Sequence, residues 1–256
     1  MPLLLVAAFL ITALLYASVG FGGGSTYNAL LVLSGADYRL MPSIALVCNV
    51  IVVCGGVWRF AHTGDLSVKR LLPFLAASVP AAWIGGRIPV SEMHFIGLLG
   101  GALLLSGLHL AFQKTSGDPE IPHGRSSPPR LLLSASIGGV IGLLSGLVGI
   151  GGGIFLAPVL YFMRWGRPRQ IAAASSLFIL VNSLSGLSGQ VAKLQDMALL
   201  SQAVPYWPLP ITVFIGGQIG SWLAGYKLDP GLIRRLTALL ILYVSARLIW
   251  RWIGMI

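Results

Sequence analysis

The 256-residue chain is hydrophobic over 56% of its length, only 9% of its residues are charged, and its mean hydropathy is +0.86. These values exclude a water-soluble globular domain and predict an integral membrane protein. The formal net charge of +10 comes from Lys and Arg scattered over short loops, which indicates contact with anionic lipid and argues against binding of nucleic acid.

The first apolar segment, residues 3–33, lies in a stretch without any charged side chain. Its composition is continuously Leu-, Ala- and Gly-rich, which favours helices over the alternating strands of an outer-membrane barrel. No Lys or Arg precedes it, so we interpret it as a retained first helix and not as a signal peptide. As one helix it would extend about 46 Å, whereas the hydrocarbon core is about 30 Å thick. The segment is therefore too long for one simple crossing.

A run of glycines, Gly20-Phe21-Gly22-Gly23-Gly24, interrupts this first segment. Glycine inside a helix costs about 1 kcal/mol per residue relative to alanine. We therefore predict a break here, with a spanning helix before it and a short half-helix that begins near Ser25. Ser25 is the candidate N-cap of that half-helix.

The remaining segments form two groups of four around a polar linker. Hydropathy falls over residues 114–130, where four prolines and mixed charges indicate a solvated connector. The further apolar segments are residues 41–58, 71–88 and 93–112 in the first half, and 131–163, 171–192, 203–226 and 232–253 in the second. We accordingly divide the chain into a first membrane repeat (1–113), the linker (114–130) and a second membrane repeat (131–256).

The two halves match at their glycines. Gly149-Ile150-Gly151-Gly152-Gly153 follows the first run at a constant separation (149 − 20 = 129). Allowing for a longer loop, Asn182 matches Asn49 at a separation of 133 (182 − 49). The predicted fold is an all-α polytopic membrane protein of two homologous repeats, each with about four transmembrane helices and a glycine-broken first helix. The second half-helix is expected to begin near Ile154.

Paired helix breaks at membrane depth indicate a transport site. Broken backbone leaves N–H and C=O groups without partners, which costs several kcal/mol each in lipid unless protein, water or a ligand satisfies them. A half-helix that starts after glycines presents free N–H groups and a positive dipole end, which favour an anion. Close helix packing is the alternative; it explains glycines spaced four apart, but it does not require three in succession.

The repeated Gly-x-Gly-Gly-Gly, followed in the second half by Phe155-Leu156-Ala157-Pro158-Val159-Leu160, resembles the TauE/SafE, or sulfite exporter, family of membrane transporters. The resemblance covers nearly the whole chain and includes the later Ile215-Gly216-Gly217-Gln218-Ile219-Gly220. It implies a polytopic helical permease that moves small sulfur-containing or related organic anions, usually outward. The first half departs from the pattern, because Ala29 stands where the second half has Pro158, and residues 84–89 lack the glycine found at Gly220.

Twelve residues form the predicted anion site, chosen because they supply backbone N–H groups at the breaks or polar groups at matching places. They are Gly22, Gly23, Gly24, Ser25, Asn49, Arg87, Gly151, Gly152, Gly153, Ser176, Asn182 and Gln218. Each polar member also has a structural interpretation. The two Asn side chains can join neighbouring helices, Ser176 can bond to its own helix, and Arg87 can extend to the membrane interface. Gln218 is expected near the point of the second half that corresponds to Arg87.

Two other classes of function were weighed against an anion exporter. An intramembrane enzyme would need a catalytic constellation in the apolar segments, and the sequence contains no His/Glu metal motif, acidic pair or nucleophile with a base. A non-transporting assembly or sensor subunit is the other alternative. We therefore expect no enzyme activity, no cofactor and no metal, with a small anion and the lipid bilayer as partners in a multi-pass protein of the inner cell membrane. All seven acids lie in or beside predicted loops, so the coupling ion stays open, as does assembly into a homo-oligomer.

Orientation and repeat topology also stay open. Arg164, Arg167 and Arg169 form the densest basic loop, which indicates a cytosolic face. If each half crosses four times, however, Lys69, Arg70 and the linker bases place comparable charge on the opposite face. Whether the repeats are parallel or inverted depends on whether each half-helix crosses the membrane or returns.

Overall fold

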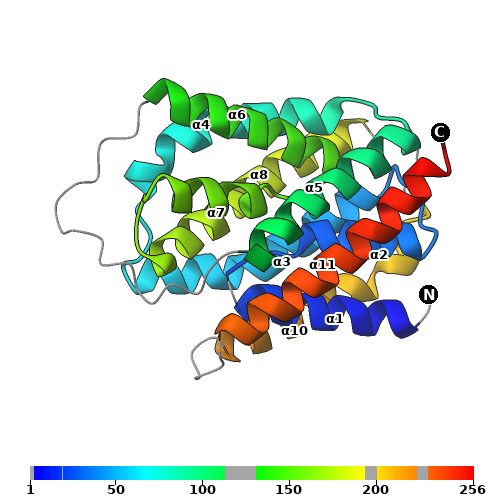
Figure 1. Cartoon of the computed structure of the whole chain (residues 1–256), viewed down its shortest axis with the longest axis horizontal. Helices are drawn as coiled ribbons and strands as arrows, with labels where there is room; N and C mark the ends of the chain where they lie inside the picture. Colours follow the sequence, from blue (N-terminus) through cyan, green and yellow to red (C-terminus); the bar gives the residue numbers. More distant parts are fainter. Residues whose placement is uncertain (1–2, 19, 113–130, 194–200, 224–229) are drawn as a thin grey trace.

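The computed structural model describes residues 3–18, 20–112, 131–193, 201–223 and 230–256, so the predicted linker at 114–130 lies outside the described residues. Every regular element in the described part is helical, and Figure 1 shows the helices packed into one bundle. The elements are α1 (Leu3–Ser18), α2 (Gly24–Leu33), α3 (Met41–His62), α4 (Val68–Arg87), α5 (Glu92–Phe112), α6 (Leu131–Val148), α7 (Gly153–Phe162), α8 (Pro168–Lys193), the 3-10 helix η1 (Val204–Tyr206), α10 (Pro208–Leu223) and α11 (Pro230–Ile253).

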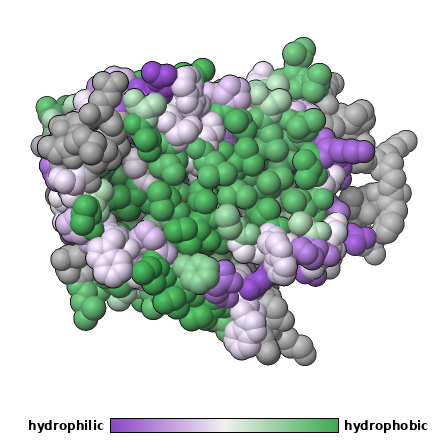
Figure 2. Space-filling model, turned by 180° about the vertical axis from the view of Figure 1, so that it is seen from behind, coloured by the Kyte–Doolittle hydropathy of each residue, from purple (hydrophilic) through white to green (hydrophobic). Residues whose placement is uncertain are grey.

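The outer surface of the bundle is suited to lipid. Among the described helices, α3, α6 and α8 are long and apolar enough to cross a membrane, and α1 and α7 are shorter apolar helices. Figure 2 shows a broad hydrophobic face with hydrophilic residues at its margins. Large apolar side chains such as Leu132, Phe162 and Trp250 are more than 80% exposed, which is unfavourable in water but normal against hydrocarbon. The number of crossings in each repeat stays a prediction.

The predicted break in each long segment is confirmed. The backbone leaves the helix after α1 and resumes at Gly24, and it leaves after α6 and resumes at Gly153. The residues just before the half-helices, Gly23 and Gly152, have φ values of 88° and 81°, which non-glycine residues rarely adopt. These two glycines are the N-caps, so the expectation that Ser25 caps α2 was wrong: Ser25 lies inside the first turn and is buried.

Helices from different halves pack closely against one another. In α6, Gly142 lies so close to α4 that a Cβ would overlap the Ser78 carbonyl oxygen, and Gly138 and Gly146 face Phe74 and Ala82 in the same way. The α1–α10 and α5–α11 pairs also join the two halves (Figure 1). Glycine at every fourth position leaves no side chain between the backbones, so helices can approach closely. The first helix of each half thus packs mainly against the other half.

Contacts between helices also fix their directions. Residue numbers rise together along α1 and α10, with Gly216 against Leu10 and Gly220 against Leu14, so these two helices are parallel. By the same criterion α10 is parallel to α3, and α4 is parallel to both α6 and α8. The α3 and α8 helices are antiparallel, since Gly56 faces Ser176 and Gly186 faces Leu46. Because α1 and α3 run in the same direction, α2 between them must turn back, so the half-helix returns.

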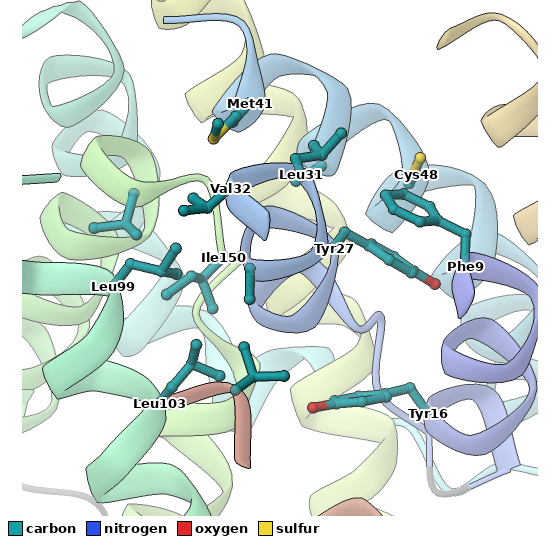
Figure 3. Packing of buried hydrophobic residues seen from close by; sticks show 14 of the residues in the cluster. Phe9, Tyr16, Tyr27, Leu31, Val32, Met41, Cys48, Leu99, Leu103 and Ile150 are labelled. Carbon is teal, nitrogen blue, oxygen red and sulfur yellow. The ribbon is translucent and has the colours of Figure 1, made fainter. Parts of the chain in front are cut away.

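A hydrophobic cluster positions both glycine breaks. The Phe9 ring of α1 stacks on Tyr27 of α2 with ring centroids 4.8 Å apart. Ile150, in the second break, is 5% exposed and belongs to the same buried cluster as Leu99 and Leu103 of α5 (Figure 3). Apolar packing on α1 and α5 therefore holds the two breaks in place.

Candidate functional site

Asn49, fully buried near the middle of α3, contacts both glycine breaks. Its Nδ2 donates a hydrogen bond to the Ile150 carbonyl oxygen at 2.9 Å. A Cβ added to Gly22 or Gly24 would overlap the Asn49 amide, and one added to Gly151 would lie 2.8 Å from Asn49 Nδ2. The two breaks, about 130 residues apart in the sequence, therefore meet at one amide side chain.

Side-chain donors satisfy carbonyl oxygens in both breaks. Ser176 Oγ of α8 donates to the Gly20 carbonyl at 2.5 Å. Asn28 Nδ2 of α2 donates to the carbonyls of Val148 and Gly149, at 2.8 and 3.0 Å. With the Asn49 bond to Ile150, four carbonyl oxygens in or beside the two breaks, those of Gly20, Val148, Gly149 and Ile150, have side-chain partners, and each partner comes from the opposite half of the chain.

The N–H groups at the start of the half-helices have no such side-chain partners among the residues that the structure describes. Neither α2 nor α7 has a side-chain cap, although the first four N–H groups of a helix have no acceptor within it. Gly24 and Gly153 are buried, so these donors and the positive dipole ends lie inside the protein. The helix N-termini thus offer uncapped donors, which an anion complements. The side-chain oxygens of Asn28 and Asn49 are buried acceptors without a hydrogen-bond partner in the described part of the chain, and they can accept from a protonated ligand oxygen or a water.

Two hydroxyl groups add to the donors near the second break. Ser183 Oγ lies 2.9 Å from where a Cβ on Gly151 would stand, and Ser145 Cβ lies 3.3 Å from that of Gly152. Both hydroxyls are buried, and neither has a hydrogen-bond partner in the described part of the chain. Since a hydroxyl rotates to suit its partner, both can donate to a ligand oxygen.

The contacts correct the predicted match between Asn49 and Asn182. Asn49 lies against Gly24, and Ile179 lies against the matching Gly153. The residue of α8 that corresponds to Asn49 of α3 is therefore Ile179, so the two helices match at a separation of 130 (179 − 49) in place of 133. Three residues are almost one helical turn. Asn182 therefore lies one turn further along α8, where its Nδ2 donates to the Phe178 carbonyl of its own helix at 2.8 Å. Among the described residues, only the first half contributes an amide where the breaks meet.

Arg87 is not brought to the breaks. It is exposed at the end of α4, and its guanidinium stacks on the Trp83 ring of its own helix at 4.7 Å from the centroid. Gly85 packs on the Leu143 carbonyl as Gly220 packs on that of Leu14, and these leucines are 129 residues apart. Gly85 is therefore the counterpart of Gly220. The expectation that the first half lacks this glycine was wrong.

Gln218 lies beside α3, away from Arg87. Its Nε2 is 3.0 Å from the position of a Cβ on Gly55, and its Oε1 accepts a hydrogen bond from Arg59 Nη2 at 3.4 Å. With the separation of 135 between Gly85 and Gly220, the counterpart of Gln218 in the first half is Trp83 (218 − 83 = 135). The expected pairing of Gln218 with Arg87 was wrong by one turn.

Sequence reasoning missed four polar residues near the site: Asn28, Arg59, Ser145 and Ser183. Asn28, Ser145 and Ser183 lie within apolar segments and Arg59 directly follows one, and a polar side chain in or beside such a segment is itself a signal of function or of helix contact. Asn28 was missed because it has no match in the second half, where Ala157 stands. A search restricted to matching positions could not find it.

Basic loops from both halves lie together on one face of the bundle. Arg70 at the start of α4 donates to the Trp165 carbonyl and stacks over that ring, 4.5 Å from its centroid. Arg169 forms a 3.6 Å salt bridge with Asp65. Lys69 and Arg70 are therefore on the same face as the Arg164–Arg169 cluster, and not on the opposite one, because each half-helix returns.

No group of three or more His, Cys, Asp or Glu side chains that could hold a metal ion occurs among the described residues. The polar groups at the breaks are amides, hydroxyls and backbone N–H groups. They are suited to binding an anion by hydrogen bonds.

Comparisons with known proteins point to one family. The family model described as "Sulfite exporter TauE/SafE" matches residues 4–248. The "Probable membrane transporter protein y4hK" of Sinorhizobium fredii is 33% identical over 249 residues, which cover 96% of this chain and 97% of that protein. The "Sulfite exporter TauE/SafE family protein 3" of Arabidopsis thaliana is 25% identical over 218 residues, 81% of this chain but only 40% of that longer protein. No solved structure matches the chain.

Proposed function

Because the chain belongs to the sulfite exporter TauE/SafE family of membrane proteins, we propose that it exports a small oxyanion such as sulfite or a sulfonate. Its family makes it a membrane transporter, and the proposal concerns the substrate and the site. The anion is held where the two glycine breaks meet, beside Asn49. Its oxygens accept hydrogen bonds from the first N–H groups of α2 and α7 and from the hydroxyls of Ser145 and Ser183.

One observation carries this proposal. At both breaks, carbonyl oxygens are bonded by side chains, whereas the helix N-termini have no side-chain caps. A cation would need oxygen ligands, and four carbonyl oxygens at the breaks already accept hydrogen bonds from side chains. An oxyanion needs donors and a positive dipole end, and these remain. The buried, uncapped donors therefore favour an acceptor-rich anion.

The directions of the helices support inverted repeats. The counterparts α1 and α6, α3 and α8, and α4 and α10 run in opposite directions. In our proposal a pseudo-twofold axis in the membrane plane relates residues 1–113 to 131–256 and passes near Asn49. Such repeats allow two conformations that open the same central site to opposite sides, which is the usual basis of alternating access.

The distribution of charge supports an orientation. The loops around Lys69 and Arg70 and around Arg164–Arg169 share one face, and positive loops generally stay in the cytosol. We place this basic face on the cytosolic side of the inner cell membrane. The opposite face carries the α4–α5 turn and both described ends of the chain, which lie at the same end of the bundle in Figure 1.

The test compares two fully buried asparagines that have different partners. Asn49→Ala removes the amide that touches both breaks, whereas Asn182→Ala removes one that bonds only to its own helix among the described residues. In proteoliposomes we expect sulfite and methanesulfonate flux to fall by a factor of about 10 or more in Asn49→Ala, since a buried hydrogen bond is worth about 1–3 kcal/mol. Asn182→Ala should transport like the wild type. The melting temperature and elution profile of each variant report whether it folds.

Three outcomes would count against the proposal. No flux and no anion-dependent rise in melting temperature for the folded wild type would exclude an oxyanion transporter. Anion binding without flux would favour a sensor subunit. Equal losses in both Asn variants would mean that the site does not lie at the breaks.

A further inference from the structure

We propose that Arg59 forms a second oxyanion-binding site, through which the anion passes between the basic face and Asn49. This inference rests on the proposed transport function. The site, called here the Arg59 cluster, consists of Arg59, Gln218, Gly55, Gly56, Ser176 and Gly20.

Arg59 is a half-buried cation with a weak partner. It lies in the last turn of α3, and its Nη2 donates to the neutral amide oxygen of Gln218 at 3.4 Å, which is long for such a bond. None of the salt bridges among the described residues includes Arg59. Asp65, a few residues further on, already accepts from Thr63 at 2.8 Å and pairs with Arg169. The guanidinium of Arg59 therefore retains donors and charge for a ligand.

The packing is loose at Gly56, between Arg59 and the first break. An added Cβ on Gly56 would have Ser176 Oγ, at 3.9 Å, as its only neighbour within 4 Å, so no side chain fills the volume beside this glycine. Ser176 Oγ in turn bonds to the Gly20 carbonyl, and Gly20 and Phe21 are only partly buried. Gly56, Ser176 and Gly20 thus connect the Arg59 cluster to the first break, with the Phe60 ring 3.5 Å from where a Cβ on Gly20 would stand.

The matching positions in the other half are tightly packed. With the separation of 130, the counterparts of Gly56 and Arg59 are Gly186 and Gly189. A Cβ on Gly186 would lie 3.2 Å from the Gly146 Cα, and one on Gly189 would overlap the Trp83 carbonyl oxygen. Direct backbone packing leaves no room there. In this conformation the packing is looser at the Arg59 end than at the matching end of the other half.

The Arg59 cluster is separate from the central site. Arg59 follows Asn49 by ten residues in α3, which corresponds to about 15 Å along a helix. An arginine side chain is too short to contact an anion bound at Asn49 across that distance. Arg59 therefore binds the anion before or after Asn49 does.

The chemistry of the cluster selects oxyanions. The planar guanidinium can place two parallel N–H groups on two oxygens of a sulfite, sulfonate or carboxylate. Gln218 Nε2, directed toward Gly55, adds a neutral donor. Lysine at position 59 would keep the charge but lose the paired donors, so the two residues are not equivalent here.

The test measures concentration dependence from each side of the membrane. Sulfite transport is recorded in everted vesicles, which present the basic face outward if it is cytosolic, and in right-side-out vesicles. In Arg59→Gln we expect the half-saturating sulfite concentration to rise by about tenfold from the basic face, with the maximal rate near that of the wild type and little change from the opposite face. Arg59→Lys should show a smaller rise. Arg87→Gln, which changes an exposed arginine at the other end of the bundle, is the control and should match the wild type.

Failure of this inference is distinguishable from failure of the transport function. A wild type that transports sulfite, together with an Arg59→Gln variant of unchanged half-saturating concentration, would overturn only the Arg59 site. Equal changes from both faces would mean that Arg59 acts on overall structure, and would also overturn it. If Arg59→Gln does not fold, the half-saturating sulfite concentration of Arg59→Lys is the test. A value equal to that of the wild type would exclude the paired-donor contact and overturn the Arg59 site. A wild type without transport would instead overturn the function itself.

Discussion

At the scale of single residues, the glycines of the two breaks are required for different reasons. Gly23 and Gly152 have positive φ, so any side chain strains the backbone there. Gly22 and Gly24 have no such constraint, but a Cβ on either would overlap Asn49. Their role is to let the amide reach both breaks. The same small residues thus serve backbone geometry in one case and side-chain access in the other.

A pair of glycine-to-alanine variants separates access from helix propensity. Gly24→Ala should displace Asn49, destabilise the protein by about 1–3 kcal/mol and abolish the anion-dependent rise in melting temperature. Gly101→Ala, in the interior of α5, has no heavy atom within 4 Å of the new Cβ, so it should be neutral or slightly stabilising. Thermal unfolding in detergent, with and without sulfite, measures both effects. An unchanged sulfite response in Gly24→Ala would contradict the contact with Asn49.

At the scale of helices, glycines spaced four residues apart allow two helices to pack closely. Gly138, Gly142 and Gly146 of α6 lie directly on carbonyl groups of α4, and Gly216 and Gly220 of α10 lie on those of α1. In lipid there is little hydrophobic drive to join helices, so association depends on close van der Waals packing. Close packing in the α4–α6 and α1–α10 pairs therefore joins the first helix of each half to the other half.

Neighbouring glycines of α6 test this packing. Gly142→Ala would drive a methyl group into the Ser78 carbonyl. It should lower the free energy of unfolding by about 1–3 kcal/mol, and the melting temperature should fall accordingly. Gly139→Ala is the matched control, because its nearest neighbour is Ala77 Cβ at 3.7 Å, an ordinary contact. Thermal denaturation of both variants in detergent measures the difference. Equal melting temperatures would show that α4 and α6 are less closely packed than described.

At the scale of the whole molecule, the returning half-helices decide where charge lies. Because α2 and α7 turn back, each half places its third helix in the same direction as its first. The loops at residues 63–67 and 163–167 then meet on one face, where Arg70 contacts Trp165 and Asp65 pairs with Arg169. The basic residues of both halves reinforce one another, which supports a single orientation.

Cysteine labelling tests this topology. Arg167→Cys, on the basic face, should react with a membrane-impermeant maleimide only in everted vesicles, and Ser91→Cys, in the α4–α5 turn, only in right-side-out vesicles. Both positions are exposed. Cys48 is buried, but Cys54 is exposed on α3, so both variants also carry Cys54→Ser, and the chain with Cys54→Ser alone is the control. Labelling of both variants from the same side would contradict the returning half-helices.

The sequence alone determined the membrane class, the family resemblance and the positions of both helix breaks. These features are local: hydropathy is a property of a segment, and the cost of successive glycines falls on the backbone where they stand. The glycine matches at a separation of 129 were found because the break requires the residue type itself. Asn49 and Ser176 could also be selected, as polar residues within apolar segments.

Only the tertiary structure decided which residues meet. Helix register across two halves is set by packing, so a match of Asn49 with Asn182 looked sound in the sequence, while the contacts place Ile179 opposite and Asn182 one turn away. Whether a ten-residue half-helix crosses or returns depends on its neighbours and not on its composition. That direction determined the common basic face and the link between Gln218 and Arg59, neither of which a linear pattern contains.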